Sequence, residues 1–142
     1  MPVIRGVVEH GDARGRELGF PTANIPIIGP AHLDGVWAGT VEYAPGRLAV
    51  AAVSIGYRTT FYTEHGQRLL EAYLLDFSGD LYGRELTVNL VSYLRPQVTY
   101  TTAEDLIEQL HEDVVQARLW AANYWPTLAA ASPRRELQGT PA

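Results

Sequence analysis

The sequence predicts a mainly β protein, an antiparallel barrel or sandwich, followed by a single amphipathic helix. Two observations lead to this prediction. Through the first two-thirds of the chain, short runs rich in β-branched and aromatic residues follow one another closely, with no helical pattern between them. After residue 100 the apolar residues recur at helical spacing instead.

Turn residues divide the first part of the chain into strands. Strand-like segments occupy residues 3–9, 35–43, 48–55, 68–77 and 86–93. In the second of these, alternation places Trp37, Val41 and Tyr43 on one side. The third is almost wholly apolar, which is typical of a strand buried on both faces. The Pro45-Gly46 pair between those two segments predicts a turn.

The helical segment begins near a pair of threonines. Thr101 or Thr102 could cap it, and Thr101 with Glu104 fits a capping box. The apolar stripe that follows consists of Leu106, Ile107, Leu110, Val114, Ala117 and Ala121. We expect this stripe to pack on the barrel, because isolated amphipathic helices are marginal in water. Pro126 should end the helix, so we divide the chain into a domain at 1–126 and a flexible tail at 127–142.

Composition limits the class of protein and the kind of partner. The 142 residues suffice for one domain with a single core. The formal net charge of −5 argues against a nucleic-acid or anionic-membrane partner, and the absence of cysteine excludes disulfides and thiolate metal sites. No apolar run has the roughly 18 residues of a membrane-spanning helix, and the N-terminus has no hydrophobic export segment. We therefore expect a cytoplasmic protein.

The most informative segment for function is Gly-Phe-Pro-Thr-Ala-Asn at residues 19–24. Thr22 and Asn24 offer hard oxygen ligands, and side chains two residues apart in an extended chain point the same way. The glycine-rich loop before them contains Arg14 and Arg16, which can balance phosphate charge. These residues favour a phosphate-and-magnesium site, and the alternative is a plain solvated loop. Because no Walker A loop is present, any phosphate chemistry must use another architecture.

Glu71 is the candidate catalytic residue. It lies in mid-strand among apolar neighbours, where alternation places it with Tyr73 and Leu75. It is either a solvent-facing strand residue or a general base that accepts a proton from a substrate hydroxyl. The turn at Asp80-Leu81-Tyr82-Gly83 either lines a ligand pocket or is an ordinary hairpin turn. Arg95 either holds a phosphate or a polar ring edge, or is a surface cation.

Two other kinds of site find no support in the sequence. The four histidines show no pairing at metal-ligand spacing. The segment Ser54-Ile55-Gly56 lacks the flanking glycine of a nucleophile elbow, which disfavours a serine hydrolase.

Taken together, these segments resemble the riboflavin kinase family, and the resemblance runs from Gly6 to about Trp120. Several signatures carry it in the family's order, which makes it far more specific than any one of them. They are Gly11 through Asn24 with its Pro-Thr-Ala-Asn, Asp34-Gly35 before Val36-Trp37-Ala38-Gly39, Ser54-Ile55-Gly56, Leu70 through Phe77, Asp80-Leu81-Tyr82-Gly83, and Leu94-Arg95-Pro96.

The resemblance implies a six-stranded antiparallel Greek-key barrel with a C-terminal α-helix packed on it. It also implies transfer of the ATP γ-phosphoryl group to the 5′-hydroxyl of riboflavin, giving FMN, with Mg²⁺ or another divalent cation. Glu71 would activate the ribityl hydroxyl, and Thr22 and Asn24 would hold the metal and the phosphates. The implied ATP contacts are Gly11, Gly15, Arg16, Thr22, Asn24, Leu74, Asp76 and Tyr82. The implied flavin contacts are Arg95, Val98 and Tyr100.

Three departures from the family's pattern bear on substrate choice. Ala13 stands where a second loop glycine is common, Thr59 in residues 57–61 stands where the bacterial Arg-Pro-Thr-Phe pattern has its proline, and Gln97 replaces an acidic residue. No adenylyltransferase domain precedes Gly6, so we expect a monomeric stand-alone kinase or an excised module. The alternatives are a non-catalytic flavin-binding or regulatory module on the same barrel, and an enzyme of this fold that acts on a different substrate.

Overall fold

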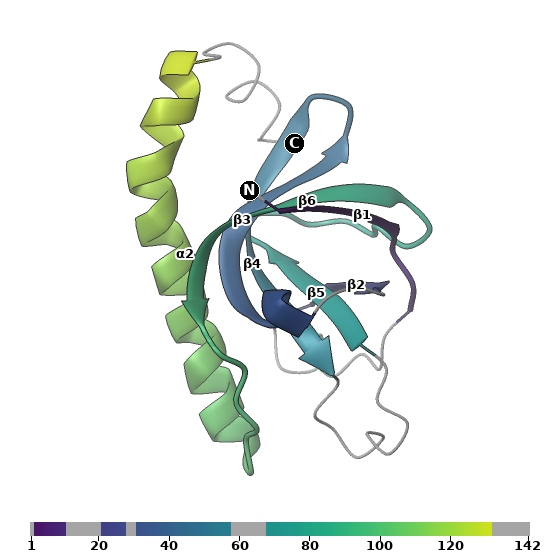
Figure 1. Cartoon of the computed structure of the whole chain (residues 1–142), viewed down its shortest axis with the longest axis vertical. Coiled ribbons are helices and arrows are strands. Elements are labelled where there is room, and N and C mark those ends of the chain that lie inside the picture. Colours follow the sequence, from purple (N-terminus) through teal and green to yellow (C-terminus); the bar gives the residue numbers. More distant parts are fainter. Residues whose placement is uncertain (1, 11–20, 28–30, 58–67, 132–142) are drawn as a thin grey trace.

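Six strands wrap into a nearly closed barrel, and one long helix lies along its outside (Figure 1). This computed structural model describes residues 2–10, 21–27, 31–57 and 68–131. Its elements are β1 (Val3–Val7), β2 (Ala23–Pro26), the short 3₁₀ helix η1 (Ala31–Leu33), β3 (Gly35–Ala44), β4 (Arg47–Tyr57), β5 (Arg68–Leu74), β6 (Glu85–Arg95) and α2 (Ala103–Ala131). Each strand expected from the sequence is present, with its ends shifted by a few residues.

The strand order β1-β6-β3-β4-β5-β2 joins antiparallel neighbours throughout. Because β6 returns beside β3 after the run β3, β4 and β5, these four strands form a Greek key. The two edge strands approach each other where the amide of Glu9 donates to the carbonyl of Asn24 at 2.8 Å. The Greek-key barrel that the resemblance implied is therefore confirmed.

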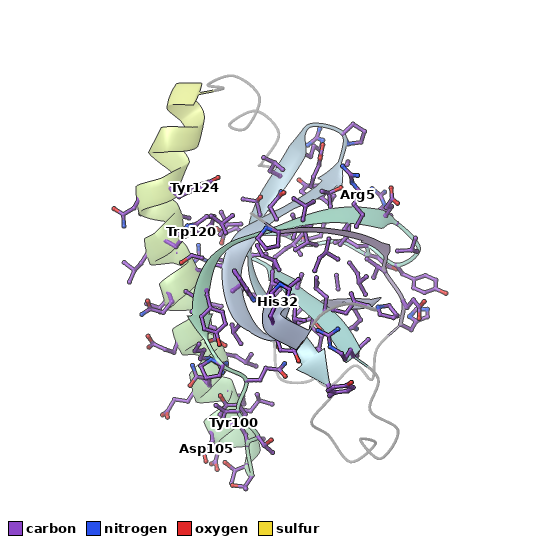
Figure 2. The ribbon with its side chains drawn as sticks, in the orientation of Figure 1. Arg5, His32, Tyr100, Asp105, Trp120 and Tyr124 are labelled. Atoms are coloured by element: carbon purple, nitrogen blue, oxygen red, sulfur yellow. The ribbon has the colours of Figure 1, made fainter. Side chains whose placement is uncertain are left out.

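Alternation along the strands fills the barrel interior with aliphatic side chains, as the sticks in Figure 2 show. The largest fully buried side chains are Ile25, Val41, Val53, Ile55, Leu70, Leu86, Val88 and Leu90. Val41 and Tyr43 of β3 belong to this core and Trp37 packs against it, as their alternation predicts. A side chain at Gly39 would place its Cβ 1.9 Å from the carbonyl oxygen of Asn89, so only glycine lets β6 pass this close to β3.

Helix α2 covers the outer face of the barrel. Its Ala117 packs with Ala38 of β3 and with Leu75 in a second apolar cluster. The other members of this cluster are Val50, Ala52, Tyr73, Leu94, Val114 and Trp120. Strand β4 is thus covered on both faces, which accounts for its almost wholly apolar sequence. The expectation that the helical stripe packs on the barrel is confirmed.

The structure shows which threonine caps the start of α2 and where the helix ends. The amide of Asp105 donates to Thr102 Oγ1 at 3.1 Å, so Thr102 rather than Thr101 caps the helix. The predicted end before Pro126 is wrong, because α2 continues to Ala131. A proline removes one helical hydrogen bond, but the segment that follows is rich in leucine and alanine, which are strong helix formers. Of the flexible tail predicted at 127–142, residues 127–131 belong to α2, and residues 132–142 lie outside the described residues.

Within the described ranges, no helix is both long enough and apolar enough to cross a membrane.

Candidate active site

Three polar side chains, one each from β2, β5 and β4, form a row on the barrel surface. Asn24 lies opposite Glu71 in one ladder, and Glu71 lies opposite Ser54 in the next. Opposed residues in antiparallel strands present their side chains on the same face, with Cβ atoms about 5 Å apart. We call Asn24, Glu71 and Ser54 the polar row.

The polar row faces away from the barrel interior, because its sequence neighbours face inward. The flanking residues Ala23, Ile25, Val53, Ile55, Leu70 and Ala72 are all buried in the barrel core. The three row residues are themselves half-buried. Glu71 therefore lies on the outer face of the barrel. This position fits both a solvent-facing strand residue and a general base, and its place opposite Asn24 favours the general base.

Thr22 and Asn24 present their side-chain oxygens next to each other, as expected for residues two apart in an extended chain. The Thr22 hydroxyl donates to Asn24 Oδ1 at 3.4 Å. Magnesium takes oxygen ligands at about 2.1 Å in octahedral geometry, so neighbouring ligand oxygens lie about 3 Å apart. The spacing of these two oxygens therefore fits a pair of ligands to one magnesium ion.

A groove of about 540 Å³ adjoins the polar row at Asn24. Its walls come from residues 8–10, residues 21–24, the end of β5 at 72–74 and the turn at 77–82. Asn24 belongs to both the groove and the polar row. Small-molecule sites in proteins commonly have volumes of about 300–1,000 Å³, so the groove is large enough for a bound metabolite.

Leu74, Asp76 and Tyr82 are among the ATP contacts that the resemblance implies, and Leu74 and Tyr82 line the groove. The Tyr82 ring stacks on His10, with centroids 3.7 Å apart and planes inclined by 16°. Asp76 is not among the groove-lining residues, and its carboxylate accepts two hydrogen bonds of 2.9 Å from Arg118 of α2. These hydrogen bonds hold the pKa of the Asp76 carboxyl below its ordinary value.

The remaining nucleotide contacts implied by the resemblance, Gly11, Gly15 and Arg16, lie outside the described residues, as do Ala13 and Thr59. Their roles stay predictions.

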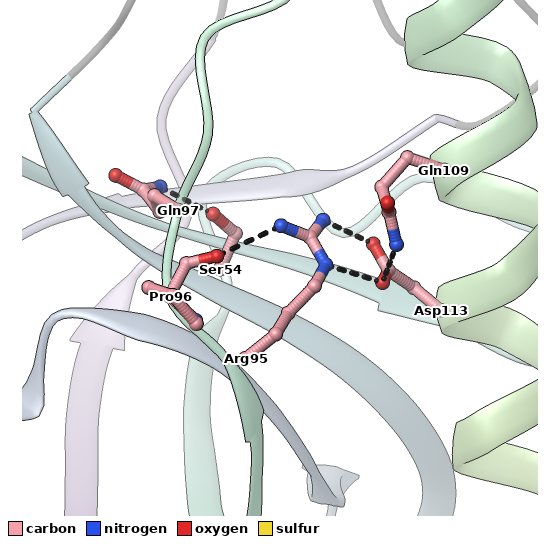
Figure 3. A network of polar contacts seen from close by, with 6 residues as sticks. All are labelled: Ser54, Arg95, Pro96, Gln97, Gln109 and Asp113. Carbon is pink, nitrogen blue, oxygen red and sulfur yellow. Dashed lines mark hydrogen bonds and ion pairs between the residues drawn. The ribbon is translucent and has the colours of Figure 1, made fainter.

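Residues 96–102, which we call the connector, join β6 to α2. The connector reaches the polar row at Ser54 (Figure 3), whereas the groove adjoins the row at its other end, Asn24. Gln97 donates from Nε2 to Ser54 Oγ at 2.6 Å. Arg95 donates from Nε and Nη2 to the two carboxylate oxygens of Asp113, at 2.8 and 2.7 Å. Its Nη1 donates to the carbonyl of Pro96 at 2.9 Å. The guanidinium therefore ties the start of the connector to α2.

Asp113 is the important residue of this region that the sequence analysis missed. It is only 5% exposed, and it accepts a third hydrogen bond from Gln109 at 3.0 Å. Burial alone would lower the pKa of the Arg95 guanidinium, but the hydrogen bonds and charge of Asp113 outweigh it and raise that pKa. A signal was available, because Asp113 lies one helical turn before Ala117 on the apolar stripe. A carboxylate in that position requires a cationic partner.

Two further residues implied for the flavin side lie in the connector. Val98 is 52% exposed, and Tyr100 lies beside the N-terminal part of α2 (Figure 2). The Tyr100 hydroxyl is buried and has no hydrogen-bond partner among the described residues. Burial raises the pKa of Tyr100, and the charge of Asp113 adds to this effect while that of Arg95 opposes it. A bound ligand could supply the missing partner, because leaving a buried polar group unpaired is costly.

The structure thus brings together residues from distant parts of the chain. Thr22 and Asn24 line the groove, and Glu71 lies opposite Asn24 in the next strand. Ser54 lies beyond Glu71 and accepts a hydrogen bond from Gln97 of the connector, which also contains Val98 and Tyr100. An arrangement with paired oxygen ligands, a carboxylate and a groove suits the transfer of a charged group to an alcohol.

The amino-acid sequence was compared with protein families and with curated proteins. The riboflavin kinase (flavokinase) family model matches residues 2–121. The bifunctional riboflavin kinase/FMN adenylyltransferase of Listeria monocytogenes is 34% identical over 119 residues, which cover 83% of this chain and 38% of that protein. The Pseudomonas fluorescens enzyme of the same name is 38% identical over 120 residues, with coverage of 84% and 38%. The bifunctional riboflavin kinase/FMN phosphatase of Arabidopsis thaliana is 36% identical over 117 residues, with coverage of 78% and 30%.

Solved structures give the same result for the fold. Riboflavin kinase from Trypanosoma brucei matches with a TM-score of 0.59 and 27% identity, over 84% of this chain and 79% of that one. A Streptococcus pneumoniae protein named a macrolide-efflux protein matches with a TM-score of 0.69 and 33% identity, over 82% of this chain and 38% of that one. The fold and site define a protein with an antiparallel barrel, one covering helix and a candidate ligand-binding groove. The chain belongs to the riboflavin kinase family. It spans less than half the length of the curated relatives described above.

Proposed function

We propose that this chain is a riboflavin kinase that transfers the γ-phosphoryl group of ATP to the 5′-hydroxyl of riboflavin, yielding FMN and ADP. One observation carries the proposal: Asn24 belongs to the groove and also lies opposite Glu71. A phosphoryl donor in the groove and an alcohol along the polar row would therefore meet at these two residues. The names of the relatives support the identity of the substrates.

The nucleoside of ATP fits the end of the groove formed by Leu74 and Tyr82. The Tyr82 ring and its stacked neighbour His10 provide a flat surface for a base. The phosphates would extend from there toward Thr22 and Asn24, whose side-chain oxygens lie next to each other in the same groove.

Thr22 Oγ1 and Asn24 Oδ1 are the ligands we assign to Mg²⁺ or another divalent cation. When bound, the metal would neutralise the negative charge of the phosphates during transfer. The described residues contain no group of three or more His, Asp or Glu side chains that could hold a metal. Two neutral ligands therefore suit a metal that arrives with the nucleotide phosphates.

Glu71 acts as the general base in this proposal. Its carboxylate accepts the proton of the 5′-hydroxyl while the 5′-oxygen bonds to the γ-phosphorus. The bond between that phosphorus and the bridging oxygen of ADP breaks, and the proton passes from Glu71 to solvent. Holding donor and acceptor next to each other supplies much of the remaining rate enhancement.

The flavin ring would extend from the polar row toward the connector. Val98 offers exposed apolar surface there, and the Tyr100 hydroxyl, which has no partner in the described part of the chain, offers a polar contact. Arg95 already donates to Asp113 and Pro96, so its part would be to hold the connector in place. The monomeric state, the cytoplasmic location and the lack of a nucleic-acid partner stay predictions from the sequence.

Incubation with riboflavin and Mg-ATP, followed by chromatographic detection of FMN, tests the function. Glu71→Gln should lower the rate by roughly 10²–10⁴-fold, the range for loss of a general base, with ATP affinity nearly unchanged. Glu85→Gln is the matched control, because Glu85 is an exposed glutamate at the start of β6.

Each alternative predicts a different result in this assay. Near-normal turnover by the Glu71→Gln variant would refute the role of Glu71. Riboflavin binding without any FMN from the wild-type protein would favour a non-catalytic flavin-binding module. Phosphorylation of another alcohol in place of riboflavin would favour a changed substrate.

A further inference from the structure

Residues 77–82, which we call the groove turn, form one wall of the groove, and a side chain of α2 holds the residue that precedes them. That residue is Asp76, whose carboxylate accepts two hydrogen bonds of 2.9 Å from the two terminal nitrogens of Arg118. The phosphoryl transfer proposed above gives this ion pair no part.

Asp76 has a backbone conformation that needs support. Its φ is 56°, and among the described residues it is the only non-glycine with a positive φ. This left-handed region is costly for residues with a Cβ atom, although aspartate tolerates it better than most. Such conformations persist where the surrounding structure fixes them, and they gather at ligand sites. Arg118 supplies a constraint of this kind, because two parallel hydrogen bonds fix both the position and the orientation of the carboxylate.

The far end of the groove turn is anchored independently of α2. The amide of Gly83 donates to the carbonyl of Val8 at 2.9 Å, and the amide of Val8 donates to the carbonyl of Arg84 at 3.0 Å. The groove turn is therefore held between this backbone pairing and the ion pair of Asp76 with Arg118. A change at the ion pair would alter how the turn faces the groove.

The ion pair contributes to the geometry of the turn more than to the stability of the fold. The side chain of Arg118 is 52% exposed and that of Asp76 is 73% exposed. Exposed ion pairs add little to the free energy of unfolding. Variants that lack this pair should therefore fold, and their nucleotide binding can be measured directly.

We propose that Arg118 is a positioning residue for the nucleotide, which sets the orientation of the groove turn through Asp76 and so couples α2 to the affinity for Mg-ATP. The proposal rests on the proposed kinase function, which places ATP in the groove. Asp76 does not line the groove, so in this proposal it acts on ATP through the turn that follows it.

Three single variants and one double variant test the proposal. Arg118→Met removes the guanidinium but keeps an unbranched apolar side chain of similar length, and Arg118→Lys keeps the charge without the paired hydrogen bonds. Asp76→Asn removes the carboxylate and keeps a residue that tolerates positive φ. The double variant combines Arg118→Met with Asp76→Asn. Arg5→Met is the matched control, because Arg5 is exposed on β1 and does not line the groove.

Calorimetry with Mg-ATP in the absence of riboflavin measures the Kd of each variant. Arg118→Met should raise this Kd by about three- to fivefold, because the loss cannot exceed the contribution of an exposed ion pair. Arg118→Lys should lie between Arg118→Met and the wild type. The double variant should bind no more weakly than the more affected single variant, since both changes remove the same interaction. Arg5→Met should leave the Kd unchanged, and the KM for riboflavin should stay constant throughout.

Asp76→Asn separates positioning from simple attraction between Arg118 and the phosphates. If Arg118 acted only through its charge, removing the neighbouring carboxylate would strengthen the binding of Mg-ATP. Positioning predicts that Asp76→Asn weakens binding, as Arg118→Met does. Stronger binding by Asp76→Asn would overturn the proposal, and so would an unchanged Kd in an Arg118→Met protein whose thermal unfolding shows that it is folded.

Amide ¹H–¹⁵N NMR spectra without nucleotide report on the groove turn directly. The signals of Gly79 and Tyr82 should move in Arg118→Met and stay in place in Arg5→Met, and signals that stay in place in both would overturn the proposal. If the wild-type protein binds Mg-ATP but makes no FMN, the proposed function fails, while the Kd values still decide the role of Arg118. If it does not bind Mg-ATP at all, the proposed function and the proposed coupling both fail.

Discussion

The buried carboxylate of Asp113 offers the clearest test of what holds the connector against α2. Replacing it by asparagine keeps the shape of the side chain but removes its charge. The carboxylate accepts hydrogen bonds from Arg95 Nε, Arg95 Nη2 and Gln109 Nε2 at 2.8, 2.7 and 3.0 Å. The amide of asparagine keeps one acceptor oxygen and turns an NH₂ group toward the guanidinium, so at least one of these bonds becomes a donor–donor contact.

The expected loss of stability follows from this geometry. Breaking a buried ion pair by removing one partner costs about 3–5 kcal/mol. The Arg95 side chain is 21% exposed and that of Asp113 is 8% exposed, so water can partly hydrate the guanidinium that is left unpaired. We therefore expect a loss near the lower end, about 3 kcal/mol. For a chain of this length, that corresponds to a fall in Tm of about 10 °C.

Urea and thermal unfolding near neutral pH, followed by circular dichroism, measure this loss. Glu112→Gln is the matched control, because it removes a carboxylate from the adjacent residue of the same helix. Glu112 is exposed and accepts one hydrogen bond from Gln116. Its replacement should change the free energy of unfolding by about 0.5 kcal/mol or less. If Asp113→Asn is no more destabilising than Glu112→Gln, the argument that the Arg95–Asp113 pair stabilises the connector is refuted.

Two further predictions concern the groove and the exposed ion pair. Asn24→Ala should weaken Mg-ATP binding measured by calorimetry, whereas Asn123→Ala, at an exposed asparagine of α2, should leave it unchanged; equal affinities would count against the metal site. Asp76→Asn should lower stability by about 1 kcal/mol or less, because the pair with Arg118 is exposed. The pKa of Asp76 is lowered in the folded state, so this difference should be present above about pH 5 and disappear as pH falls through the folded-state pKa. A difference in urea stability that grows on acidification would contradict this sign.

Much of the fold could be predicted from local patterns. The alternation in residues 35–43 and the apolar run in 48–55 depend only on which face each side chain occupies, and the structure confirms both. The end of α2 was misplaced, because a single proline was weighed above the helix-forming residues that follow it. The choice of Thr102 over Thr101 as the cap depends on backbone geometry that the two adjacent threonines do not reveal in sequence.

Some residues of the candidate site could likewise be predicted from local patterns, and others could not. Thr22 and Asn24 were predictable as neighbours, because residues two apart on an extended chain share a face whatever surrounds them. Asp113 was missed although its place on the apolar stripe was a signal; what the sequence did not reveal is that Arg95 is its partner. The partner of Gln97 left no such signal, because Ser54 is 43 residues away in sequence.

The class of fold, the oxygen pair at Thr22 and Asn24 and the choice of Glu71 as candidate base could all be read from the amino-acid sequence. That Asn24, Glu71 and Ser54 lie in one row, and that Asp113 holds Arg95, became visible only in the folded chain. The difference lies in how far along the chain the deciding interactions reach. Strand and helix patterns follow from each residue's immediate neighbours, whereas the register between strands and the burial of a helix face are set by packing across the whole core.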